Sequence, residues 1–514
     1  MVITSIFIII HLWSADVLNY LNNCMNNTEV KKITIIGGGT SAWLSAAYLT
    51  SKGFYVTVID KEIGNTVGVG EATILGFGEF MSDCGFEFND WFINCDATFK
   101  AGILYPNWIE EGNEIWHPFY LSPNIENNIR LHDAWTHNQE LDFKTRGLSL
   151  YDVSKKNKID TTIINSYAFH IDAGKLVKYI QERLAKQCSY IQSEVTDVIK
   201  DNLGNVQSLK LRNNNTVYAD LFIDCTGVSS VINKDNKFEN LYGRLFCNTA
   251  IAGRVEYMDK QKEMRPFTKA DAVEHGWVWT TPTASRIGSG LVFDRNITSV
   301  DEAKNFFVKY WDNRVSVQDL RVLDWTPRYT KTPWVGNVVS IGLSAGFIEP
   351  LESTGIALIQ SQVRNLVDRI SDFSYTTTSI NLYNSQFEES FENTVDFVSL
   401  HYSKTKRTEP FWQNVIANYE KSDGIKIKEK MLQSGPLYTE QRKSSHIFSG
   451  ANWTTWLVQM GYEIGYSSIV SKQIALDALE RYNTAVEQYR HTWSIDHSQE
   501  VSRMRVYSDN YLKR

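Results

Sequence analysis

The first residues with an evident chemical use form a glycine-rich turn. Gly37, Gly39 and Ala42 follow an apolar run in the pattern Gly-x-Gly-x-x-Ala, and Asp60 stands at the end of the next apolar run. Gly37 suits a tight turn, Gly39 lets a pyrophosphate approach the backbone, and Ala42 lets a helix pack against the strand. Asp60 would reach ribose hydroxyls, which a purely structural turn does not explain. The spacing predicts a dinucleotide site.

A second candidate is the lysine in TFKAGILYPNW, residues 98–108, where Lys100 stands among residues typical of a buried strand. A lone lysine commonly lays its stem on apolar surface and keeps its ammonium in water. If the ammonium is buried, lost hydration lowers its pKa by roughly 3–5 units, and the amine becomes a usable nucleophile. The lysine alone leaves both interpretations open.

The segments around the glycine-rich turn indicate how it is held. Residues 32–36 are typical of a short strand, the segment GGGTSAWLSAAYLTSKG is typical of a turn and helix ending at Gly53, and residues 54–60 are typical of the next strand. A helical crossover of this kind implies parallel strands. The expected fold class is therefore α/β.

Further segments extend this pattern. We expect a helix at 172–187, strands within 190–224, strands at 245–257, 276–281, 286–294 and 338–342, and a helix from about 353 to 370. The nucleotide-binding pieces are thus dispersed over 32–72, 190–230 and 335–360. We expect an N-terminal extension (1–30), a nucleotide-binding domain with inserted strands (31–375) and a mostly helical substrate-binding lobe (376–514).

Composition narrows the class of function. The net charge of −7 over 514 residues, without a run of Lys or Arg, argues against a nucleic-acid partner. Hydrophobic content of 43% and charged content of 22% are typical of a soluble globular protein. The six cysteines form no C-x-x-C pair, which favours reduced thiols in a cytoplasmic protein over a disulfide scaffold or a metal site.

The N-terminus requires a separate hypothesis. The apolar run in MVITSIFIIIHLW is too short to cross a bilayer and lacks the basic start of a secretory signal, so no membrane association is expected. A second methionine, Met25, precedes the nucleotide-binding pattern. We expect residues 1–24 to be disordered or to result from a mis-assigned start.

Distal motifs favour FAD over NAD. The segments VGVGEAT (67–73) and LFIDCTGVSS (221–230) are similar to additional FAD contacts of the glutathione-reductase-type Rossmann fold. Flavin hydroxylases of that class carry a late Gly-Asp pair at the ribitol, and here Leu343 takes the place of the aspartate. The domain at 31–375 is therefore expected to bind FAD.

Six motifs in register identify a family resemblance. The segments GGGTSAW, GVGEAT, TFKAGILYPNW, WHPF (116–119), GWVWTTP (276–282) and GLSAGFIEPLESTGI occur in the order and spacing of flavin-dependent halogenases of the tryptophan halogenase type. The resemblance runs from about residue 32 to 360, and less clearly through RTEPFW (407–412). The Trp-x-Trp-x-Ile-Pro signature matches partially, because Thr281 replaces isoleucine.

The resemblance implies a mechanism. Reduced FAD and O2 form a flavin hydroperoxide that oxidises halide to hypohalous acid, which passes through a tunnel to a lysine beside an aromatic substrate. Lys100 matches that lysine, and the oxidant there is either hydrogen-bonded or converted to a haloamine. Glu352 matches the adjacent carboxylate that orients the oxidant and accepts the proton leaving the ring. Because no NAD(P)H site is legible, reduced FAD is expected to diffuse from a separate NAD(P)H-dependent flavin reductase.

The resemblance also assigns binding residues. Halide contacts fall on Ser353, Thr354 and Gly355, at a helix start whose partial positive charge favours anions. The FAD contacts, besides those in the glycine-rich turn, are Thr40, Ser41, Glu71, Ala72, Val195, Leu343 and Ile356. The aromatic substrate pocket is expected at His117, Phe119, Trp277 and Trp279, with no metal.

The substrate stays open. The paired tyrosines and glutamate by which tryptophan-specific members hold the amino acid have no convincing match in residues 444–466. An indole, a phenol or another electron-rich ring is expected, and the family includes viral members of broad substrate tolerance. The chain fixes neither the preferred halide, nor the ring position, nor the oligomeric state, for which a homo-oligomer is possible.

Alternative interpretations stay open as well. The chain could be a flavin hydroxylase, or a flavin-binding protein without activity. The pair His170-x-Asp172 could belong to a non-haem iron site, although Asp172 is equally suited to cap a helix. Glu352 could likewise cap the helix that follows it.

Overall fold

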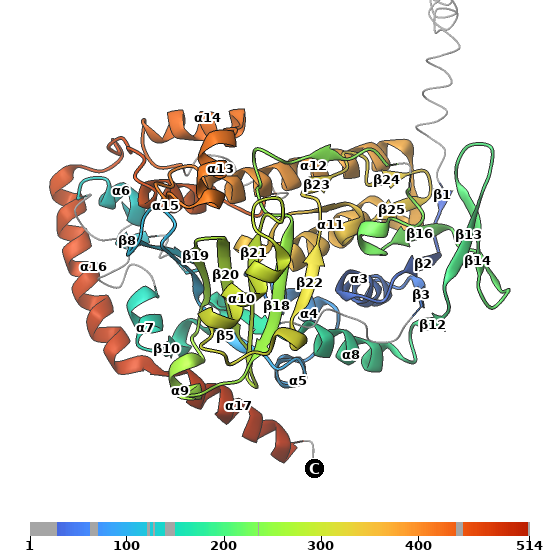
Figure 1. Cartoon of the computed structure of the whole chain (residues 1–514), viewed down its shortest axis with the longest axis horizontal. Helices are drawn as coiled ribbons and strands as arrows, with labels where there is room; N and C mark the ends of the chain where they lie inside the picture. Colours follow the sequence, from blue (N-terminus) through green and yellow to red (C-terminus); the bar gives the residue numbers. More distant parts are fainter. Residues whose placement is uncertain are drawn as a thin grey trace, which may run out of the picture.

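The structure is a computed structural model that describes residues 28–61, 70–120, 124–126, 129–138, 150–234, 236–437 and 446–511 (Figure 1). The hypothesis on residues 1–24 and the first part of VGVGEAT, residues 67–69, fall outside these described residues.

A six-stranded sheet forms the base of the nucleotide-binding domain. Its order is β12-β3-β2-β16-β25-β24, and all neighbours are parallel except β24 and β25. The bounds are β2 Lys32–Ile36, β3 Tyr55–Asp60, β12 Ser189–Gln192, β16 Leu221–Asp224, β24 Trp334–Val335 and β25 Val338–Ser340. The near-continuous apolar runs of β2 and β16 are those of strands covered on both faces.

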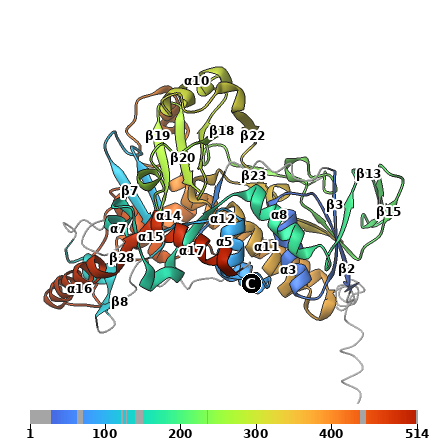
Figure 2. The same cartoon turned by 90° about the horizontal axis from the view of Figure 1, so that it is seen from below.

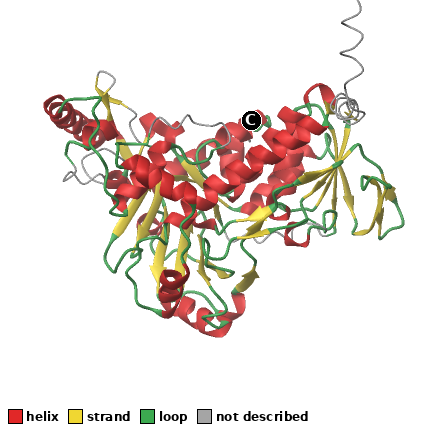
Figure 3. Ribbon diagram, turned by 90° about the horizontal axis from the view of Figure 1, so that it is seen from above, coloured by secondary structure: helices red, strands yellow, loops and turns green. Residues whose placement is uncertain are grey.

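The two covers of this sheet differ. One is a layer of three helices, α3 (Thr40–Ser51), α8 (Ala173–Leu184) and α11 (Gly355–Arg369). The other is an antiparallel sheet of β13 (Val195–Lys200), β14 (Val206–Leu211) and β15 (Thr216–Val217), whose Leu209 shares a core with Ile36 and Phe222. Helices form a band along one side of the molecule (Figure 3).

A second, seven-stranded sheet carries the inserted strands, in the order β22-β18-β21-β20-β19-β6-β7. The bounds are β6 Gly102–Pro106, β7 Glu114–Pro118, β18 Thr249–Val255, β19 Thr268–Val273, β20 Gly276–Pro282, β21 Ile287–Phe293 and β22 Arg321–Asp324. Its pairs are antiparallel except β19 with β6. Helix α10 (Val300–Tyr310) covers one face of it through Ala303 and Phe307.

A small sheet of three strands connects the two large ones. It has the order β4-β11-β5, with β4 Glu71–Ala72, β11 Ala168–Ile171 and β5 Thr98–Lys100, so β5 is an edge strand. Helices α4 (Phe77–Asp83) and α5 (Phe88–Asn94) pack against this sheet, and rings of α5 contact Phe99 and Phe169. This aromatic packing fixes the strand that carries Lys100.

The C-terminal part is helical, as expected. It contains α12 Thr377–Leu400, α13 Pro410–Asn418, α14 Asp423–Leu432, α15 Gly450–Gln459, α16 Lys472–Trp493 and α17 His497–Tyr511. Helices α12, α13 and α15 share one hydrophobic core with β6, β7 and β20. The domain division at 375/376 therefore stays a prediction, because the elements on its two sides pack together.

The remaining elements are short. They are β1 Thr28–Glu29, β8 Asn124–Glu126, β9 Ile129–Arg130, β10 Lys158–Asp160, β17 Glu239–Asn240, β23 Arg328–Tyr329, β26 Gly346–Phe347, β27 Ser374–Tyr375, β28 Ser494–Asp496, α6 Leu131–Trp135, α7 Tyr151–Lys155, α9 Lys260–Glu263 and six 3-10 turns within the described residues. Strand β28 pairs with β10, so the chain returns from α16 to the central part (Figure 2).

Most expected segments are confirmed, with two differences. The strand expected at 245–257 begins only at Thr249, because the preceding residues pack into the core as irregular chain. The strand expected in 98–108 is two strands, β5 and β6, separated at Ala101. There the Ala101 amide binds the Pro266 carbonyl oxygen, and the chain passes from the small sheet to the large one. Across the described residues, no helix combines the length and apolar character needed to span a bilayer.

Candidate active site

Lys100 is fully buried. Its Nζ donates hydrogen bonds of 2.9 Å to the Thr73 carbonyl oxygen and of 2.9 Å to Ser353 Oγ, and it lies 4.9 Å from the centre of the Phe119 ring. Burial lowers the pKa of Lys100 to about 7, against the opposing charge of Glu352. The interpretation of an ammonium reaching into water is therefore wrong.

Glu352 is equally buried and is bound by two histidines. It ends a 3-10 turn, Pro350–Glu352; its Oε2 lies 2.8 Å from His117 Nδ1 and its Oε1 2.7 Å from His401 Nε2. Burial alone would raise the pKa of Glu352, but the two histidines hold it well below its usual range. The carboxyl group accepts from side chains, so the alternative that it caps α11 is wrong; Thr354 is the N-cap residue.

The hydrogen-bond partners of each histidine define its protons. His117 Nε2 lies 3.1 Å from the Asn452 amide nitrogen, which donates, so His117 donates to Glu352 through Nδ1. His401 Nδ1 lies 2.9 Å from the Phe397 carbonyl oxygen, which only accepts. His401 Nδ1 therefore carries a proton, and a second proton is shared between its Nε2 and Glu352. Because the pKa of Glu352 is held well below its usual range, this second proton lies on the His401 side of the pair, although burial lowers the pKa of His401.

His401 is the main residue that the sequence did not indicate. It follows the last turn of α12, far along the chain from Glu352, and its ring stacks on Trp456 with centroids 3.7 Å apart. A solitary histidine in a helix carries no motif. The amphipathic pattern of α12 could have predicted that His401 is buried, but not that it contacts Glu352.

The start of α11 is suited to an anion. Ser353 has a left-handed backbone, with φ of 58°, and turns its hydroxyl towards Lys100. Within the described residues, the buried Thr354 hydroxyl has no hydrogen-bond partner, and no side chain caps the helix. A Cβ added at Gly355 would meet no atom within 4 Å, which indicates open space there. An uncapped helix start beside a lysine fits a halide ion.

The glycine-rich turn fits a pyrophosphate. Gly37 has φ of +119°, and a Cβ there would lie 2.3 Å from the Cys225 carbonyl oxygen, so glycine is required. Gly39 is the N-cap of α3 without a side-chain cap, and a Cβ on it would meet nothing within 4 Å. Thr40, Ser41 and Ala42 begin the helix at this open end.

The other expected FAD contacts are spread around this turn. Asp60 ends β3 next to a hollow of about 560 Å³, lined by Lys61, Gln192, Ser193, Glu194, Arg212 and Asn213, and Val195 begins β13 beside it. Leu343 is 41% exposed. It follows Gly342, which has φ of +73° and on which an added Cβ would lie 2.8 Å from Ser41 Cβ.

Three of the expected FAD-contact residues lie near Lys100 instead. Glu71 and Ala72 form β4, which pairs with the strand β11 that also pairs with β5. Ile356 is buried in the first turn of α11, where its side chain packs into the main core, so only its backbone faces the site.

Trp277 and Trp279 lie on one face of β20, with ring centroids 6.4 Å apart. Trp277 Nε1 donates to Glu349 Oε2 at 3.1 Å, and the Tyr402 hydroxyl donates to the same oxygen at 2.7 Å. Burial raises the pKa of Glu349 to about 7. Neither Glu349 nor Tyr402 was a candidate from the sequence, yet they fix the orientation of Trp277.

His117 and Phe119 lie at and beyond the end of β7, against the helical lobe. The His117 ring lies 5.3 Å from that of Phe397, 6.1 Å from Phe448 and 6.0 Å from Trp456. Because Phe119 also contacts the Lys100 ammonium, aromatic rings and the lysine meet at one place. Such a surface suits a flat apolar ring.

The pair His170-x-Asp172 has structural partners. Asp172 caps α8 by accepting from the Lys175 amide at 3.0 Å, and it pairs with Arg286 at 2.6 Å, so the helix-cap interpretation is confirmed. His170 bonds to the hydroxyls of Thr98 and Thr268, each at 3.0 Å. Over the described ranges, no three His, Cys, Asp or Glu side chains converge as metal ligands do.

Comparisons with known proteins agree with this geometry. A family model described as tryptophan halogenase matches residues 32–472. Tryptophan 6-halogenase ThaL of Streptomyces albogriseolus is 29% identical over 444 residues, or 80% of this chain and 83% of that protein. Tryptophan 7-halogenase RebH of Lentzea aerocolonigenes is 29% identical over 445 residues, or 79% of this chain and 82% of that protein.

A solved structure extends the similarity to the whole fold. Xcc4156, a flavin-dependent halogenase from Xanthomonas campestris, superposes with a TM-score of 0.84 at 25% identity, over 93% of this chain and 98% of that chain. The α/β architecture is therefore that of flavin-dependent halogenases, with a Rossmann-type FAD-binding domain.

Proposed function

Because the chain belongs to the tryptophan halogenase family, we propose that this flavin-dependent halogenase uses Lys100 to halogenate an electron-rich aromatic substrate. The observation that carries the proposal is the fully buried ammonium of Lys100, bonded to Ser353 at the uncapped start of α11 and influenced by Glu352. A structural lysine would not need a lowered pKa, an anion site and a bound carboxylate in one place.

The FAD site follows from the open turn. Gly37 and Gly39 would admit the pyrophosphate, Asp60 would bind ribose hydroxyls, and the hollow beside Val195 would hold the adenine end. Reduced FAD, supplied by a separate NAD(P)H-dependent reductase, provides with O2 the oxidant that converts halide to hypohalous acid. Thr354 and Gly355 would hold the halide through the helix start and through the Thr354 hydroxyl, which has no hydrogen-bond partner among the described residues.

Lys100 acts on the hypohalous acid. Since its pKa is about 7, both the ammonium and the amine are present at neutral pH. The ammonium would donate a hydrogen bond to HOX, or the amine would take the halogen and release water. In either case the ring carbon forms a bond to the halogen, the oxygen leaves as water, and the ring loses its proton to Glu352. The sum is ArH + HOX → ArX + H2O.

The aromatic side chains around Lys100 support a flat, electron-rich ring as substrate. The relatives ThaL and RebH are named as tryptophan halogenases, which supports an indole, and the surrounding rings of Phe119, Phe397 and Trp456 are equally compatible with a phenol. Buried Glu352 next to the ring would stabilise the positive charge that develops on the ring during attack and would receive its proton.

The test is a substrate and halide panel. The full chain, FAD, NADH and a flavin reductase are incubated with indoles and phenols in chloride, bromide or iodide, and the products are analysed by mass spectrometry. We expect a halogenated product whose mass follows the halide supplied. A hydroxylated product formed without halide would identify the hydroxylase alternative, and flavin turnover without product would favour a binding protein without activity.

A further inference from the structure

One side of the strand that carries Lys100 has no neighbouring strand, so another part of the chain must supply hydrogen-bond acceptors there. Strand β5 is the edge of its sheet: β11 pairs with one side only. The outward amides are those of Phe99 and Ala101. An unpaired buried amide costs about 1–3 kcal/mol, so each needs an acceptor. Ala101 finds one in the Pro266 carbonyl oxygen, at 2.7 Å.

The acceptor for Phe99 comes from the C-terminal end of the chain. The Phe99 amide donates to His497 Nε2 at 3.2 Å, and His497 Nδ1 lies 2.8 Å from the Met264 carbonyl oxygen. Because a carbonyl only accepts, the proton of the ring is on Nδ1 and Nε2 is a free acceptor. The fully buried imidazole thus bridges β5 to the segment before β19.

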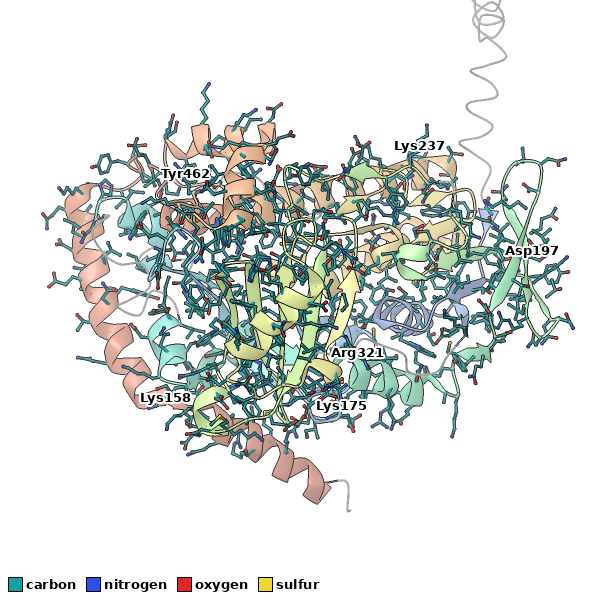
Figure 4. All side chains as sticks on the ribbon, viewed as in Figure 1. Lys158, Lys175, Asp197, Lys237, Arg321 and Tyr462 are labelled. Atoms are coloured by element: carbon teal, nitrogen blue, oxygen red, sulfur yellow. The ribbon has the colours of Figure 1, made fainter. Side chains whose placement is uncertain are left out.

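The C-terminal arm, residues 494–505, is held at several points besides this one. Strand β28 pairs with β10 through Lys158↔Asp496, Ile159↔Ile495 and Asp160↔Ser494. Val501 is buried, and Arg505 Nη2 donates to Asp96 Oδ1 at 2.8 Å. Figure 4 places Lys158 beside the junction of α16 and α17, and Figure 2 shows α17 passing next to α5.

The contacts of the arm through Arg505 and His497 lie on either side of Thr98, the first residue of β5. Asp96 precedes the strand and has a left-handed backbone, with φ of 59°. Its carboxylate also accepts from the Thr283 hydroxyl at 2.9 Å. Arg505 therefore shares with Thr283, Ser285 and Lys175 in holding the entry to β5, and His497 holds the residue just before Lys100. The arm lies beyond residues 32–472, which the family model matches.

We propose that His497 is a positioning residue for Lys100, and that the C-terminal arm sets the location of the Lys100 ammonium by completing the edge of β5. The inference rests on the proposed role of Lys100 in halogen transfer. A displacement of about 1 Å in a reacting group can cost about 10²-fold in rate, so a loose strand would reduce transfer while leaving the FAD site intact.

The test compares two replacements of His497 in the full chain. His497→Leu removes the acceptor for the Phe99 amide, whereas His497→Gln keeps an oxygen that can accept it. The readouts are halogenated product per NADH oxidised, FAD affinity and thermal unfolding. We expect about a 10–100-fold lower product yield per NADH for His497→Leu, a yield within about threefold of wild type for His497→Gln, and unchanged FAD affinity in both.

Two further variants serve as controls. His137→Leu removes a half-buried histidine whose Nε2 lies 3.1 Å from the Ser467 carbonyl oxygen, away from β5, and should leave the yield unchanged. Arg505→Gln weakens the second contact of the arm without emptying a buried site, and should lower the yield about two- to fivefold. If His497→Leu does not fold, Arg505→Gln still tests whether the arm positions Lys100.

The outcomes separate the two proposals. Equal loss in the Leu and Gln variants, or normal yields in His497→Leu and Arg505→Gln beside an inactive Lys100→Ala, would overturn the positioning role alone. A wild-type chain that forms no halogenated product would refute the proposed function, and the inference with it.

Discussion

At the scale of single residues, the site is a set of charges removed from water. Lys100 retains a positive charge only partly at neutral pH, because burial lowers its pKa. Glu352 retains its negative charge because two histidines bind its oxygens. A buried charge without a partner would destabilise the folded protein by several kcal/mol. Lys100 and Glu352 therefore both depend on the groups that bind them.

Glu352→Gln removes the charge and keeps the size of the side chain. If Glu352 takes the proton from the ring, halogenation should slow by about 10²–10⁴ while FAD still binds. Single-turnover product formation, with FAD affinity as the control, measures this. A near-normal rate would remove Glu352 from proton transfer.

His401→Gln tests the electrostatic role of the residue absent from the sequence prediction. Loss of one histidine should raise the pKa of Glu352 towards its ordinary value. Since Glu352 acts when ionised, activity would then be lost at a higher pH as the solution is acidified. A pH profile of kcat/KM should show its acid limb shifted to higher pH, and an unshifted limb would contradict the assignment.

The sequence indicated these residues unequally. Lys100 and Glu352 belong to local motifs, so their residue types and their sequence neighbours identified them as catalytic candidates. His401 and Glu349 owe their importance to partners that are distant in the chain, and a lone histidine or a glutamate before a proline has no spacing to interpret.

At the scale of elements, the start of α11 and the edge of β5 meet to form the site. Helix α11 brings an uncapped terminus, and β5 brings the lysine that bonds to Ser353. The strand-turn-helix pattern around Gly37 was predictable because its periodicity is local. The break at Ala101 was not, because it depends on Pro266, whose carbonyl oxygen holds the Ala101 amide.

Gly355→Ala adds one methyl group where a halide is proposed to bind. The backbone there tolerates alanine, and the new Cβ would meet no atom of the described chain within 4 Å, so folding should be unaffected. We expect the KM for halide to rise about tenfold, with FAD affinity unchanged. Steady-state kinetics over a range of bromide concentrations measures it. An unchanged KM would place the halide elsewhere.

At the scale of the whole molecule, the helical lobe and the large sheet form one core, and the C-terminal arm returns to the catalytic strand. Sequence periodicity predicted the helices of this lobe but not their shared core, because the pattern of one helix does not specify its partner. The division of the chain into an FAD-binding domain and a separate substrate lobe stays a prediction.

Buried neutral histidines make the stability of the molecule depend on pH. Burial lowers the pKa values of His132 and His497 to about 4 each, against an ordinary value near 6.5. Between these values the unfolded chain binds more protons, so stability is lost as the pH falls from about 6.5 to 4. Each histidine contributes about 2–3 kcal/mol to this loss.

Urea denaturation at pH 7, 5.5 and 4.5 tests this dependence. The free energy of unfolding should decrease at each step, and the variant His497→Gln should show a smaller decrease than wild type. A constant free energy over this range would mean that the two histidines are not buried in neutral form.

The central claim is that Lys100 transfers the halogen, and one measurement tests it most directly. Wild type and Lys100→Ala, both loaded with FAD and supplied with reductase, bromide and an accepted aromatic substrate, are compared for brominated product by mass spectrometry. We expect equal FAD binding and continued flavin oxidation in both, with product only in the wild type. Brominated product at a comparable rate from Lys100→Ala would contradict it.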